Sequence, residues 1–189
     1  MKRTREMPTI FVSGSGFRAA MLICLLVLSI APLLIEGKAH GASLIQKGSQ
    51  VPGFEVPLSG GGSLKLSQEL GKVPVLLLYW SLYCEHCRED LPQIQKMYER
   101  MGPSKVKVLA INGDGMSATK MVQGYWQKQR FTFVSLMDEE KSDGFLVEGL
   151  LGVAKTPAAV LVNRAGVVLF SQEGVLDLAG LEENIRKAN

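Results

Sequence analysis

Hydrophobic and polar residues follow one another in blocks that predict strands and helices in turn from residue 50 onward. Apolar runs predict buried strands at 73–80 and 106–111, the second closed by the turn 112–115, and a further strand at 131–136. Helical periodicity predicts four helices, at residues 89–101, 121–129, 145–151 and 178–188, with Gly152 ending the third. Because strands and helices alternate, the pattern predicts a central mixed sheet covered on both faces.

Two strand pairs without an intervening helix are predicted at the ends of this region. Residues 51–57 and 63–66 flank the glycine-rich turn 59–62. Residues 158–162 and 167–170 flank the turn Asn163-Arg164-Ala165-Gly166. The sequence contains no internal repeat or low-complexity segment, so a single domain is expected after the N-terminal segment.

Residues 1–41 have the layout of a signal peptide or N-terminal membrane anchor. Basic residues precede an apolar run at 19–35, and Ala39 and Gly41 occupy the −3 and −1 positions of a cleavage before Ala42. The run is longer than a usual signal core and just short of a comfortable span of about 20 residues, so an uncleaved anchor stays open. Pro32 and the polar residues after the run favour cleavage. We therefore expect an exported, periplasmic or extracytoplasmic domain at 42–189.

The charge distribution supports this division. Residues 1–41 hold five of the 21 basic and two of the 18 acidic side chains, which leaves 16 of each in residues 42–189. The sequence pI of about 8.8 therefore belongs to the N-terminal segment. A formally neutral domain gives no support for binding to nucleic acid.

Cys84 and Cys87 are the only cysteines outside the N-terminal segment. They lie where the strand at 73–80 passes into a helix. Unpaired N–H groups and the positive end of the helix dipole lower the pKa of a thiol at such a position. This predicts Cys84 as a nucleophile for thiol–disulfide exchange and Cys87 as the thiol that resolves the mixed disulfide. Cys24 follows Ile23 early in the apolar run, which is atypical of a lipoprotein cysteine.

Several motifs together resemble the thioredoxin superfamily, and within it the exported TlpA/ResA-like thiol–disulfide oxidoreductases. They are Trp80-x-x-x-Cys84-x-x-Cys87, Pro92 in the next helix, and Thr156-Pro157 directly before a strand. The resemblance covers most of residues 48–189. It implies a thioredoxin-like α/β fold: a central mixed β-sheet flanked by helices, with an N-terminal β-hairpin and a strand–helix insertion.

The resemblance also implies a substrate site. Pro157 would be cis and face the disulfide, and the backbone of Thr156 would pair with an extended substrate. Trp80 and Tyr83 would belong to the same substrate-binding region, although Tyr83 stands where the family usually has tryptophan. A trans proline in an ordinary loop is the alternative, because only about 5–6% of X–Pro bonds are cis.

The proton acceptor for Cys87 departs from thioredoxin itself. Leu78 occupies the place of thioredoxin's buried aspartate, so the acceptor cannot be there. Asp90 stands where the TlpA/ResA group usually has glutamate, three residues after Cys87 on one helix face, and is the best candidate. A solvated surface carboxylate stays open, because Arg88 and Glu89 indicate a polar face.

Glu85 and His86 lie between the cysteines and are expected to tune the redox couple. An imidazolium beside Cys84 would stabilise the thiolate and make the disulfide a stronger oxidant, whereas Glu85 would oppose this. The span from thioredoxin to DsbA, roughly −270 to −120 mV, corresponds to about 7 kcal/mol for two electrons. The direction of electron flow therefore stays open.

Other chemistries fit less well. A c-type haem site needs histidine after the second cysteine, where this chain has Arg88. The only histidine besides His86 is His40, so Cys and His cannot supply four ligands to a metal, and no cofactor is expected. The peroxiredoxin pattern Pro-x-x-x-Thr-x-x-Cys is absent. A static Cys84–Cys87 staple is a weaker alternative, because a four-residue disulfide loop adds little stability.

These observations predict an enzyme that reduces disulfides in exported proteins, including those of apocytochromes c. A disulfide oxidant or isomerase, or a non-catalytic binding module, are the alternatives. The expected partners are exported protein disulfides or thiols, together with a membrane or periplasmic thiol–disulfide partner that resets the redox state.

Overall fold

A computed structural model describes residues 43–189, so the predicted leader and its cleavage site lie outside the described part. A five-stranded sheet in the order β5-β4-β3-β8-β9 forms the centre. The central strand β3 pairs in parallel with β4 and antiparallel with β8, while β4–β5 is parallel and β8–β9 antiparallel. The predicted mixed sheet is confirmed. Its strands are β3 (Val75–Trp80), β4 (Lys107–Asn112), β5 (Val134–Met137), β8 (Ala158–Val162) and β9 (Val168–Glu173).

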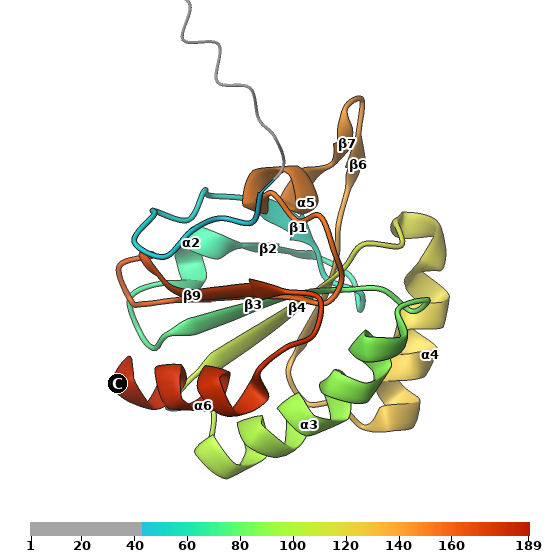
Figure 1. The fold of residues 1–189 in the computed structure, drawn as a ribbon. Coiled ribbons are helices and arrows are strands. Elements are labelled where there is room, and N and C mark those ends of the chain that lie inside the picture. Colours follow the sequence, from blue (N-terminus) through green and yellow to red (C-terminus); the bar gives the residue numbers. More distant parts are fainter. Residues whose placement is uncertain (1–42) are drawn as a thin grey trace, which may run out of the picture. The chain divides into compact units, whose positions relative to one another are not determined.

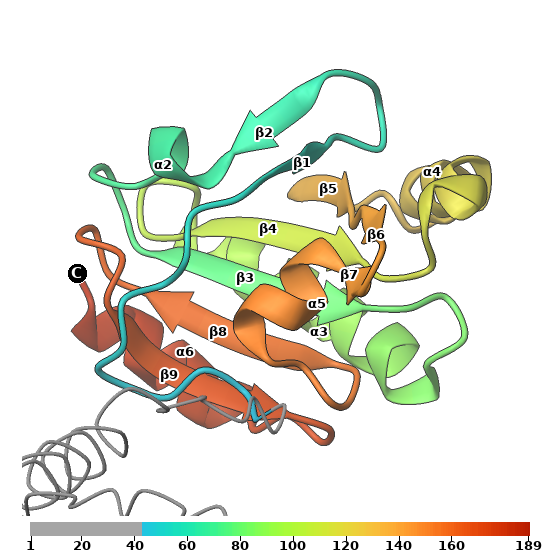
Figure 2. The ribbon, with the colours of Figure 1, turned by 90° about the horizontal axis from the view of Figure 1, so that it is seen from above.

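Helices and a hairpin cover the two faces of this sheet (Figures 1 and 2). One face packs against the three longer helices, α3 (Glu85–Met101), α4 (Thr119–Gln129) and α6 (Leu178–Lys187). The other packs against α5 (Leu146–Leu151), α2 (Leu66–Glu69) and the antiparallel hairpin of β1 (Glu55–Pro57) and β2 (Ser63–Lys65). None of the helices within residues 43–189 is long and apolar enough to cross a membrane.

The strand β3 shows why its sequence is apolar without interruption. All six of its residues are buried. Leu76, Leu78 and Trp80 belong to the core beneath α3, whereas Val75, Leu77 and Tyr79 belong to the core on the opposite face. Successive side chains of a strand point to opposite faces, so a strand covered on both sides buries every residue. Each buried large side chain contributes about 1.5–3 kcal/mol to the stability of the fold. The strand β3 is therefore held firmly in the core and provides a rigid support for the residues that follow its end.

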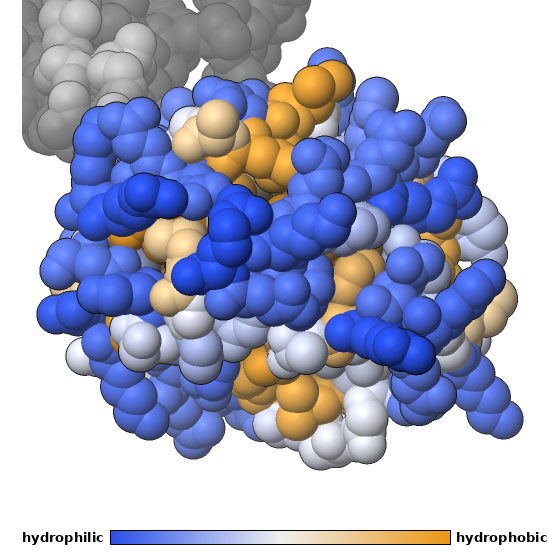
Figure 3. Space-filling model, turned by 90° about the horizontal axis from the view of Figure 1, so that it is seen from below, coloured by the Kyte–Doolittle hydropathy of each residue, from blue (hydrophilic) through white to orange (hydrophobic). Residues whose placement is uncertain are grey.

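The outer surfaces of α3 and α6 face solvent. Figure 3 looks onto this side of the molecule and shows a largely hydrophilic surface with small, separate hydrophobic areas. Glu182 of α6 joins the two helices by accepting from Arg186 at 2.6 Å and from Arg100 of α3 at 2.7 Å. These hydrogen bonds lower the pKa of Glu182. Because the arginines are exposed, each pair contributes about 1 kcal/mol or less.

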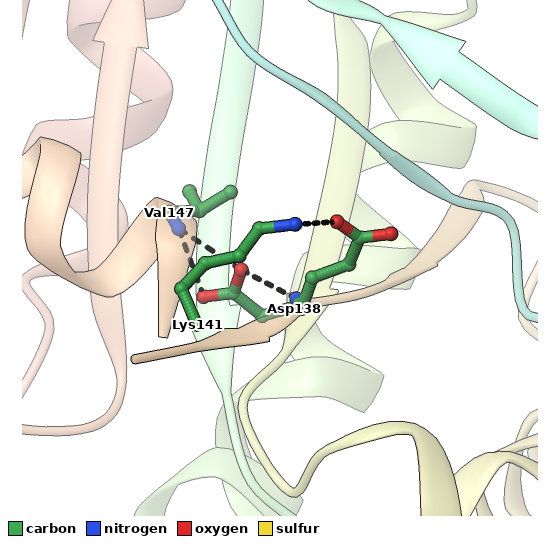
Figure 4. A network of polar contacts seen from close by, with 4 residues as sticks. Asp138, Lys141 and Val147 are labelled. Carbon is green, nitrogen blue, oxygen red and sulfur yellow. Dashed lines mark hydrogen bonds and ion pairs between the residues drawn. The ribbon is translucent and has the colours of Figure 1, made fainter. Parts of the chain in front are cut away.

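The fully buried carboxylate of Asp138 joins the end of β5 to α5 (Figure 4). It accepts the N–H groups of Glu139 and Val147, both at 2.9 Å, and of Glu148 at 3.0 Å. Charge-assisted bonds of this kind satisfy a buried carboxylate and hold the first turn of a helix. Asp138 therefore positions α5 and the loop that leads from it to Thr156.

Several predicted boundaries are wrong. Helix α3 begins at Glu85 rather than at residue 89, because its polar first turn carries no hydrophobic period. Strand β1 is limited to Glu55–Pro57, and Leu66 begins α2 instead of ending β2. Strand β9 continues to Glu173. The short 3-10 helix η2 (Met116–Ala118) and the two-residue strands β6 (Glu140–Lys141) and β7 (Gly144–Phe145) had no sequence signal.

Candidate functional site

The two cysteines form a disulfide at the junction of β3 and α3. Their Cα atoms are 5.2 Å apart, within the usual range. Cys84 is the N-cap of α3, and its sulfur accepts the N–H of Cys87 at 3.1 Å. Cys84 is half-buried, whereas Cys87 is 0% exposed and packs in the core. Cys84 is therefore the cysteine of the pair that is partly open to a partner, whereas Cys87 is closed to one.

Thr156-Pro157 lies beside the end of β3. The peptide bond is cis, as expected, and the next residue, Ala158, pairs with Tyr79 of β3. Glu173 of β9 holds the preceding loop by accepting the N–H groups of Ala154 at 2.9 Å and Lys155 at 3.1 Å. Within residues 43–189, no backbone hydrogen bond uses the N–H or C=O of Thr156. The loop thus has one unpaired peptide edge next to the end of β3.

Two exposed hydrophobic residues flank these motifs. Tyr83 directly precedes Cys84 and is 76% exposed. Val175 is 72% exposed and follows Gly174, whose N–H bonds to the C=O of Pro157 at 2.8 Å. Exposed side chains of this kind suit contact with a partner protein.

Trp80 lies elsewhere than the substrate-site expectation implies. Its side chain is fully buried and packs on Trp126 and Tyr125 of α4, with ring centroids 5.4 and 5.7 Å away. In this structure Trp80 packs in the core between β3 and α4 and offers no surface to a substrate.

Asp90 is half-buried in the second turn of α3. Burial raises the pKa of its carboxyl, and Glu89 adds to the rise while His86 opposes it. Its position three residues after Cys87 on one helix keeps it a candidate proton acceptor, and its partial burial sets it apart from an ordinary solvated carboxylate. Leu78 packs in the same core as Cys87, so β3 supplies no carboxylate beneath the disulfide.

Glu85 and His86 are both exposed on the first turn of α3. The Nδ1 atom of His86 lies 3.5 Å from a carboxylate oxygen of Glu89, and the two side chains are 58% and 63% exposed. Glu89 and solvent therefore both act on any charge that His86 carries.

The comparison with known proteins agrees with this geometry. Residues 47–171 match the model of the AhpC/TSA family. The chain belongs to the AhpC/TSA family. It is 27% identical to thiol-disulfide oxidoreductase ResA of Bacillus subtilis over 157 residues, covering 82% of this chain and 81% of ResA. ResA of Halalkalibacterium halodurans is 26% identical over 141 residues, covering 75% of this chain and 76% of that protein.

A solved structure supports the fold of this AhpC/TSA family member. A Chlorobium tepidum protein assigned as a thiol:disulfide interchange protein DsbE superposes with a TM-score of 0.66 at 28% identity, covering 77% of this chain and 99% of that one. The expected thioredoxin-like fold and the resemblance to ResA-like proteins are confirmed.

Sequence reasoning missed Asp114, in the turn after β4. Its carboxylate accepts the Ser81 hydroxyl at 2.5 Å, the Leu82 N–H at 2.7 Å and the side-chain amide of Asn112 at 2.8 Å. The turn lies close to β3, because the Gly113 N–H bonds to the C=O of Trp80 at 2.9 Å. The available signal was an aspartate just beyond a parallel strand, where α/β sheets gather functional groups.

A hollow of about 210 Å³ lies between this turn and the loop before Pro157. Its walls include Ser81, Asp114, Glu148 and Thr156. It therefore adjoins both the loop before Cys84 and the unpaired edge of Thr156. Among residues 43–189, no three His, Cys, Asp or Glu side chains are grouped to hold a metal ion.

Proposed function

We propose that this chain, a thiol–disulfide oxidoreductase by family and fold, uses Cys84 and Cys87 to reduce disulfides in exported proteins. One observation carries the proposal: the partly exposed Cys84 caps a helix and is bonded to the buried Cys87, and it follows the end of β3 beside which the unpaired backbone of Thr156 precedes β8. The resemblance to ResA-like thiol–disulfide oxidoreductases supports the direction of the reaction and the choice of apocytochromes c as partners.

The proposed reaction starts from the dithiol form. The Cys84 thiolate attacks one sulfur of the partner's disulfide, the partner's S–S bond breaks, and its other sulfur leaves as a thiolate that takes up a proton. Cys87 then loses its proton and attacks the Cys84 sulfur, which releases the second partner thiol. Two electrons pass to the partner, and the Cys84–Cys87 disulfide seen here is the product.

Asp90 is the proposed acceptor of the Cys87 proton. A carboxylate whose pKa is raised by burial binds a proton more readily than a solvated one. The position of Asp90 on the helix that carries Cys87 supports this role.

The partner would bind as an extended segment along Thr156. The free N–H and C=O of Thr156 can pair with a peptide strand, and Tyr83 and Val175 offer apolar contacts on either side. Residues 1–41 would export the domain, either as a cleaved leader or as an anchor at 19–35. A membrane or periplasmic thiol–disulfide partner would then return the protein to its dithiol form.

Trapping of the mixed disulfide tests the proposal. In an exporting cell, the full chain with Cys87→Ser should accumulate exported proteins covalently bound through Cys84, and adding Pro157→Ala should increase their yield. The matched control Cys84→Ser should trap none. Apocytochromes c among the trapped proteins would identify the partner class. Absence of trapped proteins with Cys87→Ser, or equal trapping by Cys87→Ser and Cys84→Ser, would refute the function.

Export is tested separately by a reporter fused after Asn189 that is active only outside the cytoplasm. This fusion should be active. An inactive fusion, together with activity of a second reporter at the same position that works only in the cytoplasm, would overturn the proposed location.

A further inference from the structure

Three backbone N–H groups of the loop between β3 and α3 are hydrogen-bonded to acceptors other than the Cys84 sulfur. The N–H of Leu82 donates to the Asp114 carboxylate at 2.7 Å, and that of Tyr83 donates to the Ser81 hydroxyl oxygen at 3.1 Å. The N–H of Cys84 donates to the C=O of Ser81 at 3.3 Å. The N–H that reaches the Cys84 sulfur comes instead from Cys87, at 3.1 Å.

Asp114 organises this arrangement. One carboxylate oxygen accepts from Leu82, and the other accepts the Ser81 hydroxyl at 2.5 Å, which turns the lone pairs of that hydroxyl toward Tyr83. The fully buried Asn112 holds Asp114 in turn: its amide donates to the carboxylate at 2.8 Å, and its oxygen accepts the Asp114 N–H at 3.0 Å. Asp114 thus controls two N–H groups within two residues of Cys84.

We infer that Asp114 is a positioning residue that withholds the N–H groups of Leu82 and Tyr83 from the Cys84 sulfur and so favours the disulfide over the dithiol. Backbone N–H groups in a tight loop form a site for an anion, and a thiolate that accepts them is stabilised. Stabilising the thiolate stabilises the reduced protein and makes the couple more oxidising. The negative charge of Asp114 acts in the same direction, because it disfavours a second negative charge nearby.

This inference rests on the proposed function, because it concerns the sulfur that attacks the partner. Its test is the equilibrium of the purified full-length protein with reduced and oxidised glutathione at one fixed pH, for wild type and four variants. Asp114→Ala removes the whole network. Ser81→Ala frees the N–H of Tyr83 alone. Asp143→Asn is the matched control, because it removes an exposed carboxylate of the β6–β7 turn that, within residues 43–189, makes no hydrogen bond to Asp114, Ser81 or Asn112.

Asp114→Asn separates charge from geometry. The amide oxygen can still accept from Leu82 and Asn112, and the amide nitrogen can donate to the Ser81 oxygen once that hydroxyl turns away. Only the charge is then lost, with the loop in place.

The expected result is a graded shift toward the reduced protein. Asp114→Ala should shift the equilibrium by about tenfold, or about 30 mV, and Ser81→Ala and Asp114→Asn by about threefold each. Asp143→Asn should leave it unchanged. Circular dichroism establishes that each variant is folded, and Ser81→Ala keeps the test decisive if Asp114→Ala does not fold.

Two results would overturn the inference. Folded Ser81→Ala and Asp114 variants with the wild-type equilibrium would mean that the network only stabilises the loop, and a shift toward the disulfide would mean that the sign is wrong. A wild-type protein that does not exchange with glutathione would instead remove the proposed function itself. The two failures are therefore distinguishable.

Discussion

Replacing the polar side chains of Glu85 and His86 between the two cysteines should move the reduction potential only slightly. His86 lies 3.5 Å from Glu89, and both side chains are more than half exposed. Glu85 is exposed as well. Interactions between exposed charges contribute about 0.2–1 kcal/mol, because water and salt screen them.

This range translates into a small shift of the potential. For a two-electron couple, about 1.4 kcal/mol corresponds to about 30 mV. His86→Gln should therefore lower the potential by at most about 20 mV, because the thiolate loses a neighbour that is a cation when protonated, and Glu85→Gln should raise it by a similar amount. By comparison, the span from thioredoxin to DsbA is roughly 150 mV, or about 7 kcal/mol.

Equilibration with glutathione measures these shifts directly. The double variant should return close to the wild-type potential, and the single shifts should shrink in about 1 M salt, where the Debye length is roughly 3 Å. A single shift above about 60 mV, or one that salt leaves unchanged, would refute the reasoning, since it would require a side chain desolvated against the sulfur.

Three further predictions concern stability in urea unfolding. Asp138→Ala should cost about 3–5 kcal/mol, because it leaves buried N–H groups unpaired at the start of α5, and a cost below about 1 kcal/mol would contradict this role. Gly113→Ala should cost about 1–3 kcal/mol, because its Cβ would lie 2.5 Å from the Tyr79 hydroxyl oxygen, whereas Gly149→Ala, with open space around it in α5, should be neutral or stabilising. For Asp90, burial raises the pKa above its ordinary value of 3.8, so the native state binds more protons than the unfolded chain as pH rises through that window, and stability falls. Asp90→Asn should remove this fall, so it should be more stable than wild type at neutral pH but not below about pH 3.8; a stability difference between wild type and variant that does not change with pH would contradict the shift.

The elements with a strong local signal were predictable from sequence. The predicted strand 158–162 has the bounds of β8. The helix predicted at 145–151 corresponds to α5, which ends at its C-cap Gly152 with a φ of 66°. The start of α3 was not predictable from periodicity, because its first turn from Glu85 is polar and its cap is a cysteine. Strands of two residues, such as β6 and β7, are too short for any period.

The candidate site divides in the same way. The sequence pattern was enough to predict the junction position of Cys84 and Cys87, whereas the cis bond before Pro157 was implied only by the resemblance to the thioredoxin superfamily. The role of Asp114 was not predictable, because its partner Ser81 lies 33 positions away and only the parallel pairing of β3 and β4 brings them together. Trp80 shows the opposite limit, because its place next to the motif says nothing about which face of β3 carries its side chain.

The central claim is that Cys84 is the attacking thiol, and the alkylation rates of the two cysteines test it most directly. The reduced full-length protein is treated with iodoacetamide near neutral pH, and labelling of each cysteine is followed by mass spectrometry. The helix start should favour the Cys84 thiolate by about 1 kcal/mol, roughly fivefold in thiolate, while Cys87 is 0% exposed. Labelling at Cys84 should therefore be at least about fivefold faster than at Cys87. Equal and slow labelling at both cysteines would contradict the account.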